Sequence, residues 1–212
     1  MTGGFLKRYT NLASIIHILK HRKITLLDPG SWDDRNDTYF LERYAELNRL
    51  NKVFALCMTT EAETYHHWSI FARGTDGICI EFDKQKLIKS VEKQGVIARP
   101  VLYKKIEDIT EAARHRDDLP FLKRFPYRDE GEFRLIYGCS NGDKPVYDVP
   151  FELSTIKRIH ISPWMPESLS DCIKDVLASL IPSDTDIRLN RSTLVENERW
   201  KSAVKQLDTR KL

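Results

Sequence analysis

The sequence of 212 residues has few of the features that mark specialised protein classes. It contains 9 glycines, 9 prolines and 4 cysteines, which excludes a collagen-like chain, a low-complexity chain and a disulfide-held scaffold. Its longest apolar runs, 13–16 and 53–58, fall far short of the about 20 residues that cross a bilayer. The segment 1–10 has neither an apolar signal segment nor a small-residue cleavage site. We therefore expect a cytoplasmic protein without a membrane partner.

Charge and cysteine spacing exclude two further classes. Lys and Arg total 34 and Asp and Glu total 31, so the formal net charge is only +3 at pH 7. No overall basic field therefore demands a nucleic acid partner. The cysteines lack the CxxC spacing of zinc ligands, so we expect core thiols and no metal site. These cysteines are Cys57, Cys79, Cys139 and Cys172.

Familiar catalytic motifs are also absent. The sequence has no phosphate loop, no GxGxxG after a strand, no GxSxG elbow and no HExxH motif. The adjacent residues His66 and His67 would point about 100° apart on a helix, so we interpret them as core or rim residues. Function has to be sought in local combinations of residues.

The apolar patterns predict about eight strands and about six helices. These elements do not alternate strictly, which favours an α+β fold with a mixed, mainly antiparallel sheet flanked by helices over a doubly wound parallel sheet. No repeat, linker or change of composition divides the chain. We therefore expect a single domain over residues 1–212, with a charged, frayed tail at 208–212.

Caps and breakers predict several boundaries within this fold. Asn11 is expected to cap the first helix, and 39–50 to form a helix after a polar loop. The capping-box residues 60–63 are expected to begin the next helix. The segment 96–103 is predicted as one strand, and 106–123 as an interrupted helical region.

Three stretches carry residue types that bind substrates, and the first is Lys7-Arg8-Tyr9-Thr10 at the end of the opening strand. A guanidinium suits phosphate oxygens, and the helix that follows offers free N–H groups beside it. The alternative is a solvent-facing strand end in which Thr10 or Asn11 only caps the helix.

The second stretch runs from Thr59 and Thr60 to Trp68 and Phe71. Trp68 and Phe71 are three residues apart and share a helical face, so they would form one wall of a flat pocket for a planar ring. The alternative is core packing, which is the commoner fate of aromatic residues at this spacing.

The third stretch is Glu130, Glu132 and Arg134, whose spacing puts them on one face of a strand. The opposite face, with Phe133 and Leu135, is predicted to be core. Two close carboxylates divide their labour when one stays ionised and the proton affinity of the other rises. The alternative is a solvated strand face with an internal Glu–Arg ladder.

The order of these stretches resembles an uncharacterised prokaryotic domain family found in bacteria and phages. The resemblance covers residues 5–165 and is most specific in the last motifs. The sequence departs from the family pattern at Thr38, where the family often has Pro. That family has no agreed activity. The matching motifs are Arg8-Tyr9-Thr10, Arg35-Asn36-Asp37, Phe54–Met58, the Trp68-x-x-Phe71-Ala72 segment, Gly77–Asp83 (GICIEFD) and Glu130–Arg134 (EGEFR).

More loosely, the chain is similar to ADP-ribosyltransferases, especially bacterial toxins that modify nucleic acid. Those enzymes place Arg or His on the first strand, a hydroxyl residue on a middle strand and a Glu, often within E-x-E, on a later strand. Arg8, Thr59 or Thr60, and Glu132 with Glu130 occur in that order. The resemblance implies an NAD-dependent transferase fold and NAD as a substrate. It also implies a defence or toxin–antitoxin effector that modifies nucleic acid or protein and is neutralised by an antitoxin or other regulatory protein.

The same resemblance implies the role of each residue. Arg8 would hold the pyrophosphate or ribose of NAD, and Tyr9 with Trp68 or Phe71 would wall the nicotinamide. Glu132 would bind the ribose hydroxyl and stabilise the oxocarbenium-like transition state, while Glu130 would orient or deprotonate the nucleophile. This mechanism requires the opening strand and the acidic strand to be neighbours, with Arg8 and Glu132 at a shared hollow. The other implied NAD-binding residues are Thr10, Thr59, Thr60 and Arg134.

Two other functions fit the sequence. A basic-leaning region over residues 114–134, interrupted by acidic residues, is consistent with a nucleic-acid-processing or binding protein that does not use NAD. A non-catalytic module that binds a partner protein is the second alternative, and it predicts that Glu130 and Glu132 can be replaced together without effect.

Overall fold

The structure of the protein is a computed structural model that describes residues 4–141 and 144–205. Within these residues one sheet contains nine strands, and a separate sheet contains two. The strands are β1 (Phe5–Asn11), β2 (Lys23–Leu27), β3 (Lys52–Thr59), β4 (Gly77–Asp83), β5 (Ile97–Pro100), β6 (Leu102–Lys104), β7 (Leu122–Arg124), β8 (Glu132–Cys139), β9 (Val146–Pro150), β10 (Ile156–Ile161) and β11 (Arg188–Arg191).

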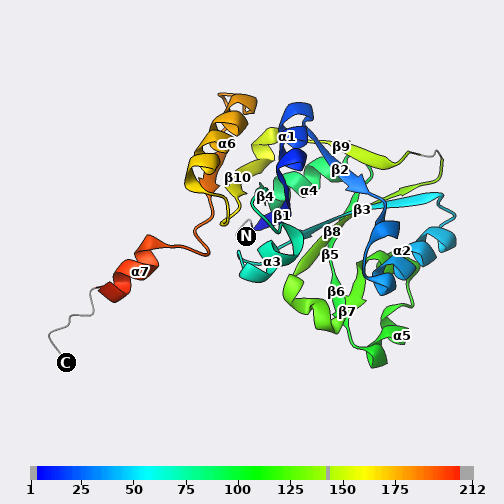
Figure 1. Cartoon of the computed structure of the whole chain (residues 1–212). Coiled ribbons are helices and arrows are strands. Elements are labelled where there is room, and N and C mark those ends of the chain that lie inside the picture. Colours follow the sequence, from blue (N-terminus) through cyan, green and yellow to red (C-terminus); the bar gives the residue numbers. More distant parts are fainter. Residues whose placement is uncertain (1–3, 142–143, 206–212) are drawn as a thin grey trace, which may run out of the picture.

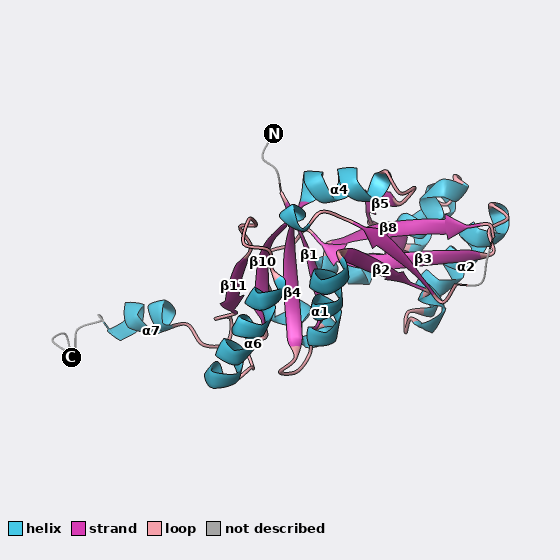
Figure 2. Cartoon of the chain, turned by 90° about the horizontal axis from the view of Figure 1, so that it is seen from above, coloured by secondary structure: helices cyan, strands magenta, loops and turns pink. Residues whose placement is uncertain are grey.

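Helices cover the sheet, and one helix lies away from it. Figure 1 shows α1, α4 and α6 around β1, β4 and β10, whereas α2 lies beside β3. Figures 1 and 2 both show α7 extending away from the other elements. None of the helices in the described residues is long and apolar enough to cross a membrane. The helices are α1 (Leu12–His21), α2 (Arg35–Leu47), α3 (Tyr65–Phe71), α4 (Lys84–Glu92), α5 (Ile109–Ala112), α6 (Glu167–Leu180) and α7 (Glu198–Lys205).

The strand pairing confirms the α+β class with a mainly antiparallel sheet. The order of the main path is β11-β10-β4-β1-β3-β2-β9, and β8 pairs with β3 and β5. Among the described pairs only β10–β11 and β6–β7 are parallel. The expectation that the opening strand and the acidic strand are neighbours is wrong, because β3 lies between β1 and β8. The end residue Thr59 of β3 pairs with Lys7 on one side and with Glu132 on the other.

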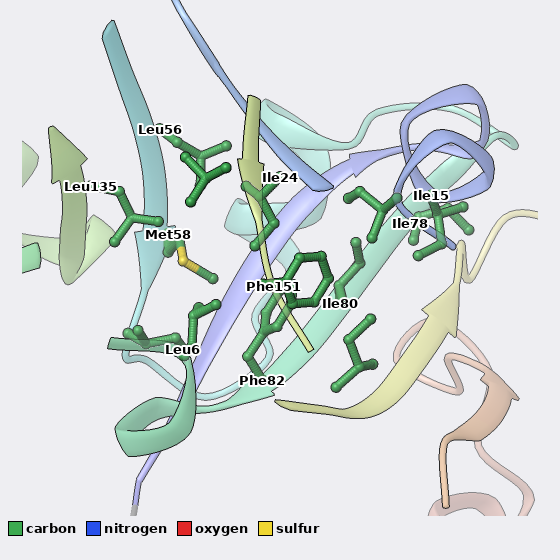
Figure 3. Packing of buried hydrophobic residues seen from close by; sticks show 14 of the residues in the cluster. Leu6, Ile15, Ile24, Leu56, Met58, Ile78, Ile80, Phe82, Leu135 and Phe151 are labelled. Atoms are coloured by element: carbon green, nitrogen blue, oxygen red, sulfur yellow. The ribbon is translucent and has the colours of Figure 1, made fainter. Parts of the chain in front are cut away.

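The main core fills the space between the sheet and its helices (Figure 3). Leu6 of β1, Ile15 of α1 and Ile80 of β4 are completely buried there. Each such side chain contributes about 1.5–3 kcal/mol of hydrophobic stabilisation. A second cluster, which includes Leu41 of α2 and Ile136 of β8, packs on the opposite face of β3 and β8. Apolar residues on both faces hold β3 and β8 firmly, so the side chains at their ends are well positioned.

The predicted caps locate the start of α1 correctly but not the starts of α2 and α3. Asn11 caps α1 as predicted, since its Oδ1 accepts a hydrogen bond of 2.9 Å from the N–H of Ser14. The helix predicted to begin at residue 39 begins at Arg35, because the Asp34 carboxylate caps it by accepting from the first free N–H groups. The capping box predicted at 60–63 is wrong, because Thr64 caps α3.

The region between β4 and β8 differs most from the prediction. The strand predicted over 96–103 is divided into β5 and β6 after Pro100, which has no N–H for a sheet hydrogen bond. The region 106–123 is mostly short 3-10 helix, with a single α-helical turn in α5, and it ends in the strand β7. The predicted tail 208–212 lies outside the described residues.

Candidate functional site

A hollow of about 170 Å³ lies where β1, β3 and β8 meet the helix α3. We call it the carboxylate pocket. Its walls combine two carboxylates, two lysines and three rings, and these side chains come from distant parts of the sequence. The residues that line it are Lys7, Tyr9, Cys57, Met58, Thr59, His67, Phe71, Lys123, Glu130 and Glu132.

The backbone explains how the two glutamates reach the same pocket. The prediction that Glu130 and Glu132 share a strand is wrong, because Glu130 ends the 3-10 helix Phe125–Glu130 and only Glu132 begins β8. Gly131 joins the two elements in a left-handed conformation (φ 51°) that favours glycine. The Thr59 hydroxyl donates a hydrogen bond of 2.7 Å to the backbone carbonyl of Glu130 and holds this junction against β3.

A network of charges surrounds Glu132. Its Oε1 accepts from Arg134 Nε at 2.5 Å, and its Oε2 lies 3.0 Å from Lys123 Nζ. The same ammonium donates to Glu130 Oε2 at 2.6 Å. Behind this group Asp37 of α2 accepts from Arg134 Nη2 at 2.6 Å and lies 3.6 Å from Lys123 Nζ. The network therefore joins three carboxylates to two cations.

The network gives the two glutamates different proton affinities. Burial by itself would raise the pKa of Glu132, but Arg134 and Lys123 together lower that pKa to about 2. For Glu130 burial outweighs Lys123, and its pKa is raised above the ordinary value. Burial likewise raises the pKa of Asp37 despite Arg134 and Lys123. Glu132 is thus ionised at neutral pH while Glu130 is the better proton acceptor, which is the division of labour expected of such a pair.

Aromatic rings form the other side of the carboxylate pocket. Tyr9 stacks on His67 with ring centroids 5.3 Å apart and an interplanar angle of 16°. His67 Nε2 donates to the carbonyl oxygen of Glu130 at 3.0 Å, so its Nδ1 accepts from the Thr64 hydroxyl. Phe71 is 42% exposed. These rings offer flat apolar surface opposite the carboxylates.

One thiol lies on the floor of the pocket. Cys57 of β3 is exposed there, although its neighbours on both sides, Leu56 and Met58, are buried. Burial of its surroundings and the nearby Glu132 raise the pKa of Cys57 well above the ordinary value. The thiol is therefore protonated at neutral pH and is no nucleophile. The described residues contain no group of three or more His, Cys, Asp or Glu that could hold a metal ion.

The fold brings together five of the predicted catalytic and NAD-binding residues and separates the others. Trp68 is completely buried, and its Nε1 donates to Glu63, so it packs in the core instead of forming a pocket wall. Arg134 is also completely buried and holds Glu132 from behind. Thr10 and Thr60 do not line the pocket. The residues that do meet there are Tyr9, Thr59, Phe71, Glu130 and Glu132.

The expectation that Arg8 shares a hollow with Glu132 is wrong. Side chains alternate along a strand, so Arg8 points to the side of the sheet opposite Lys7 and Tyr9. Arg8 lines a different cavity, of about 410 Å³, between α1, β2 and β9. Its Nη1 is buried and has no hydrogen-bond partner among the described residues. Arg8 is therefore not part of the carboxylate pocket.

Sequence reasoning missed several residues of this site. Lys123 joins both glutamates, but no local pattern distinguishes it from the other cations of residues 114–134. Asp37 belongs to the Arg35-Asn36-Asp37 motif, and that motif was its only signal. The sequence assigns no role to Lys7 of the first stretch, to His67 or to Cys57, and all three line the pocket.

Part of this chain matches a sequence family. Residues 67–135 match a family described as "Protein of unknown function (DUF2971)". The matched segment contains the GICIEFD motif and the EGEFR motif up to Leu135. The predicted resemblance to an uncharacterised family is thus confirmed over this segment. No curated protein matches the chain.

Among solved structures the chain has a distant likeness to DarT from Thermus sp. 2.9. The complex of DarT with ADP-ribosylated ssDNA is 13% identical, with a TM-score of 0.45, and the match covers 91% of this chain and 95% of that chain. The complex with NAD+ is 12% identical, with a TM-score of 0.44, and covers 91% and 96%. At these values the likeness says nothing of substrate or mechanism.

Proposed function

We propose that the protein is an NAD-consuming transferase of the ADP-ribosyltransferase type, acting in the cytoplasm. The observation that carries the proposal is the pair of glutamates with opposite pKa shifts at one pocket. Glu132 is held ionised by Arg134 and Lys123, and Glu130 beside it has a raised pKa. Such a pair supplies a fixed negative charge and a proton acceptor within reach of the same ammonium.

The size and walls of the carboxylate pocket suit one planar ring. Its volume is about 170 Å³, and Tyr9, His67 and Phe71 supply flat surface on one side. Pockets that hold aromatic ligands combine such apolar walls with a few polar groups that fix the orientation. A nicotinamide ring between these walls would bring its attached ribose toward the two carboxylates.

In the proposed reaction the two glutamates act on one bond exchange at the ribose carbon. The bond between the ribose carbon and the nicotinamide nitrogen breaks, and its electron pair leaves on that nitrogen. Glu132 stabilises the positive charge that develops on the ribose and accepts a hydrogen bond from its hydroxyl. Glu130 accepts the proton of the incoming nucleophile as the new bond to the ribose carbon forms. Nucleic acid or protein supplies the nucleophile in this proposal, and an antitoxin or other regulatory protein is its proposed partner.

Glu132 has room for one such substrate hydroxyl. A carboxylate has about four lone-pair sites. Arg134 occupies one site on Oε1, and Arg134 and Lys123 share Oε2. The remaining interaction is with the Cys57 thiol, which is a weak donor. A ribose hydroxyl is the stronger donor and would replace the thiol.

The alternative is a non-catalytic module, and one observation favours it. The side chain of Glu132 is only 4% exposed, and its oxygens are almost fully paired. A buried ion network of this kind also occurs where charges serve the fold alone. In that case neither glutamate takes part in turnover, and NAD does not enter the pocket.

NAD turnover separates the two functions. Nicotinamide release is measured for the parent chain, for Glu132→Gln and Glu130→Gln, and for the exposed control Glu152→Gln. Loss of a charge that stabilises a transition state typically costs about 100- to 1000-fold in rate. We expect that loss for Glu132→Gln and no change for Glu152→Gln, with thermal melting as the check on folding. Equal rates for Glu132→Gln and the parent refute the assignment.

A binding test does not require the acceptor. Phe71 is exposed and lines the carboxylate pocket. We expect NAD and nicotinamide to raise the melting temperature of the parent chain and to raise that of Phe71→Ser by less, because the variant lacks one ring of the pocket. A melting temperature that neither compound changes supports the non-catalytic module.

A further inference from the structure

A second hollow, of about 270 Å³, lies on the other side of Lys123 from the carboxylate pocket. We call it the basic hollow. Lys123 and Asp37 line it together with three further cations, Lys104, Lys105 and Arg124. The carboxylate of Asp37 is already held by Arg134 at 2.6 Å and by Lys123 at 3.6 Å. The basic hollow is therefore strongly positive.

The strand register brings two of these cations together. Lys104 of β6 pairs with Arg124 of β7 in the two-stranded parallel sheet, and both side chains line the basic hollow. Like charges opposite each other on neighbouring strands destabilise a sheet. Within the described part of the chain, neither side chain forms an ion pair with an acid. The fold thus places these two cations side by side at the hollow, and neither has an ion-pair partner among the described residues.

The remaining walls of the basic hollow are apolar. Phe40 of α2 and Leu122 of β7 line it beside Ile106 and Ile109. Ile106 is 71% exposed. A chain gains nothing by leaving such surface in water. A ligand that combines an anionic group with an apolar or planar body would satisfy both the cations and these walls.

We propose that the basic hollow binds a small phosphate ester, with its phosphate between Lys104 and Arg124 and its planar or apolar body against Phe40 and Ile106. A phosphate dianion neutralises two cations at once, and a guanidinium binds two of its oxygens in a planar fork. The assignment is independent of NAD chemistry. Since Lys123 lines both hollows, the ligand would lie directly behind the ammonium that bridges the two glutamates.

The test uses isothermal titration calorimetry on the full chain at low ionic strength with three probes. Phenyl phosphate carries both the anion and the ring, inorganic phosphate carries only the anion, and phenol carries only the ring. We expect phenyl phosphate to bind at least tenfold more tightly than either of the others. Binding of phenol as tight as that of phenyl phosphate overturns the role of the cations. Equal binding of phosphate and phenyl phosphate overturns the role of the apolar walls, and no binding of any probe at millimolar concentration overturns the proposal.

Matched variants locate the binding. Lys104→Ala combined with Arg124→Ala should weaken phenyl phosphate at least tenfold. Lys86→Ala combined with Lys89→Ala removes the same charge from the exposed face of α4 and should change the affinity less than twofold. Equal losses in the two double variants overturn the assignment. Phenyl phosphate binding is measured without NAD, so this result stands apart from any failure of the proposed NAD chemistry.

Stability gives a second, independent readout. Because Lys104 and Arg124 repel each other, the double variant at these positions should melt at the same temperature as the parent or higher when no ligand is present. Phenyl phosphate should raise the melting temperature of the parent and not that of this variant. A variant that melts well below the parent without ligand would mean that the two cations serve the fold, and it would overturn the proposal.

Discussion

Arg134 is the residue whose replacement should disturb the site most. Its guanidinium is completely buried and donates to Glu132, to Asp37 and to the carbonyl oxygen of Pro120 at 2.9 Å. Replacing it with Met keeps a similar length and removes the charge. Glu132 and Asp37 then lose their nearest cation, and Lys123 alone has to balance three carboxylates.

The expected cost follows from the burial of the network. Removing one partner of a buried ion pair typically costs about 3–5 kcal/mol. For a chain of this length each kcal/mol lowers the melting temperature by about 2–4 °C, so Arg134→Met should melt about 6–20 °C below the parent. Arg99→Met is the control, because Arg99 pairs with Asp118 at 2.7 Å with both side chains about one-third exposed. That pair should be worth only about 0–1 kcal/mol.

The pH dependence tests the cause. In the parent the pKa of Glu132 is about 2, below its ordinary value of 4.5. Glu132 therefore contributes stability that is present above pH 4.5 and is lost as the pH falls toward 2. Without Arg134 the burial of Glu132 raises its pKa instead. Protonation of Glu132 at low pH then removes the cost of a buried, unpaired charge and stabilises the variant. The difference in melting temperature between parent and variant should grow from pH 4 to pH 7, as measured by circular dichroism at about five pH values. A difference that is constant with pH, or no larger than that of Arg99→Met, refutes this account of the network.

Three further predictions follow from the site and the fold. The rate of NAD turnover should fall at acidic pH as Glu130, whose pKa is raised above its ordinary value, becomes protonated. Glu130→Gln should not show this decrease at acidic pH, and a variant with the same pH profile as the parent contradicts the proton-acceptor role. Phe71→Ser, which removes an exposed ring of the pocket, should raise KM for NAD severalfold in steady-state assays with little loss of folding stability, whereas an unaltered KM removes Phe71 from the pocket wall. Asn11→Ala removes the cap of α1 and should cost about 0.5–2 kcal/mol in urea unfolding, and a smaller cost would mean that the N–H of Ser14 finds another acceptor.

The candidate site was predictable where residue type alone decides the chemistry. Glu130 and Glu132 stood out because two carboxylates so close together suit acid–base work, and both line the carboxylate pocket. The prediction that Arg8 lies in the same pocket as Glu132 is wrong because side chains alternate along β1, which places Arg8 on the opposite side of the sheet from Tyr9. The prediction that Trp68 forms a pocket wall is wrong because a large ring at helical spacing packs into the core when a neighbouring element covers it.

Elements whose residues interact over a few positions follow from local order. Asn11 caps α1, and the alternation of Ile78, Ile80 and Phe82 makes β4, because capping and periodicity depend only on near neighbours in the chain. The charge network has no such local cause. Asp37 and Arg134 are 97 residues apart, and they meet because α2 packs on the face of β3 and β8 opposite the main core. The pKa values of Glu132 and Glu130 depend on that meeting, since burial and nearby charge are properties of the folded molecule.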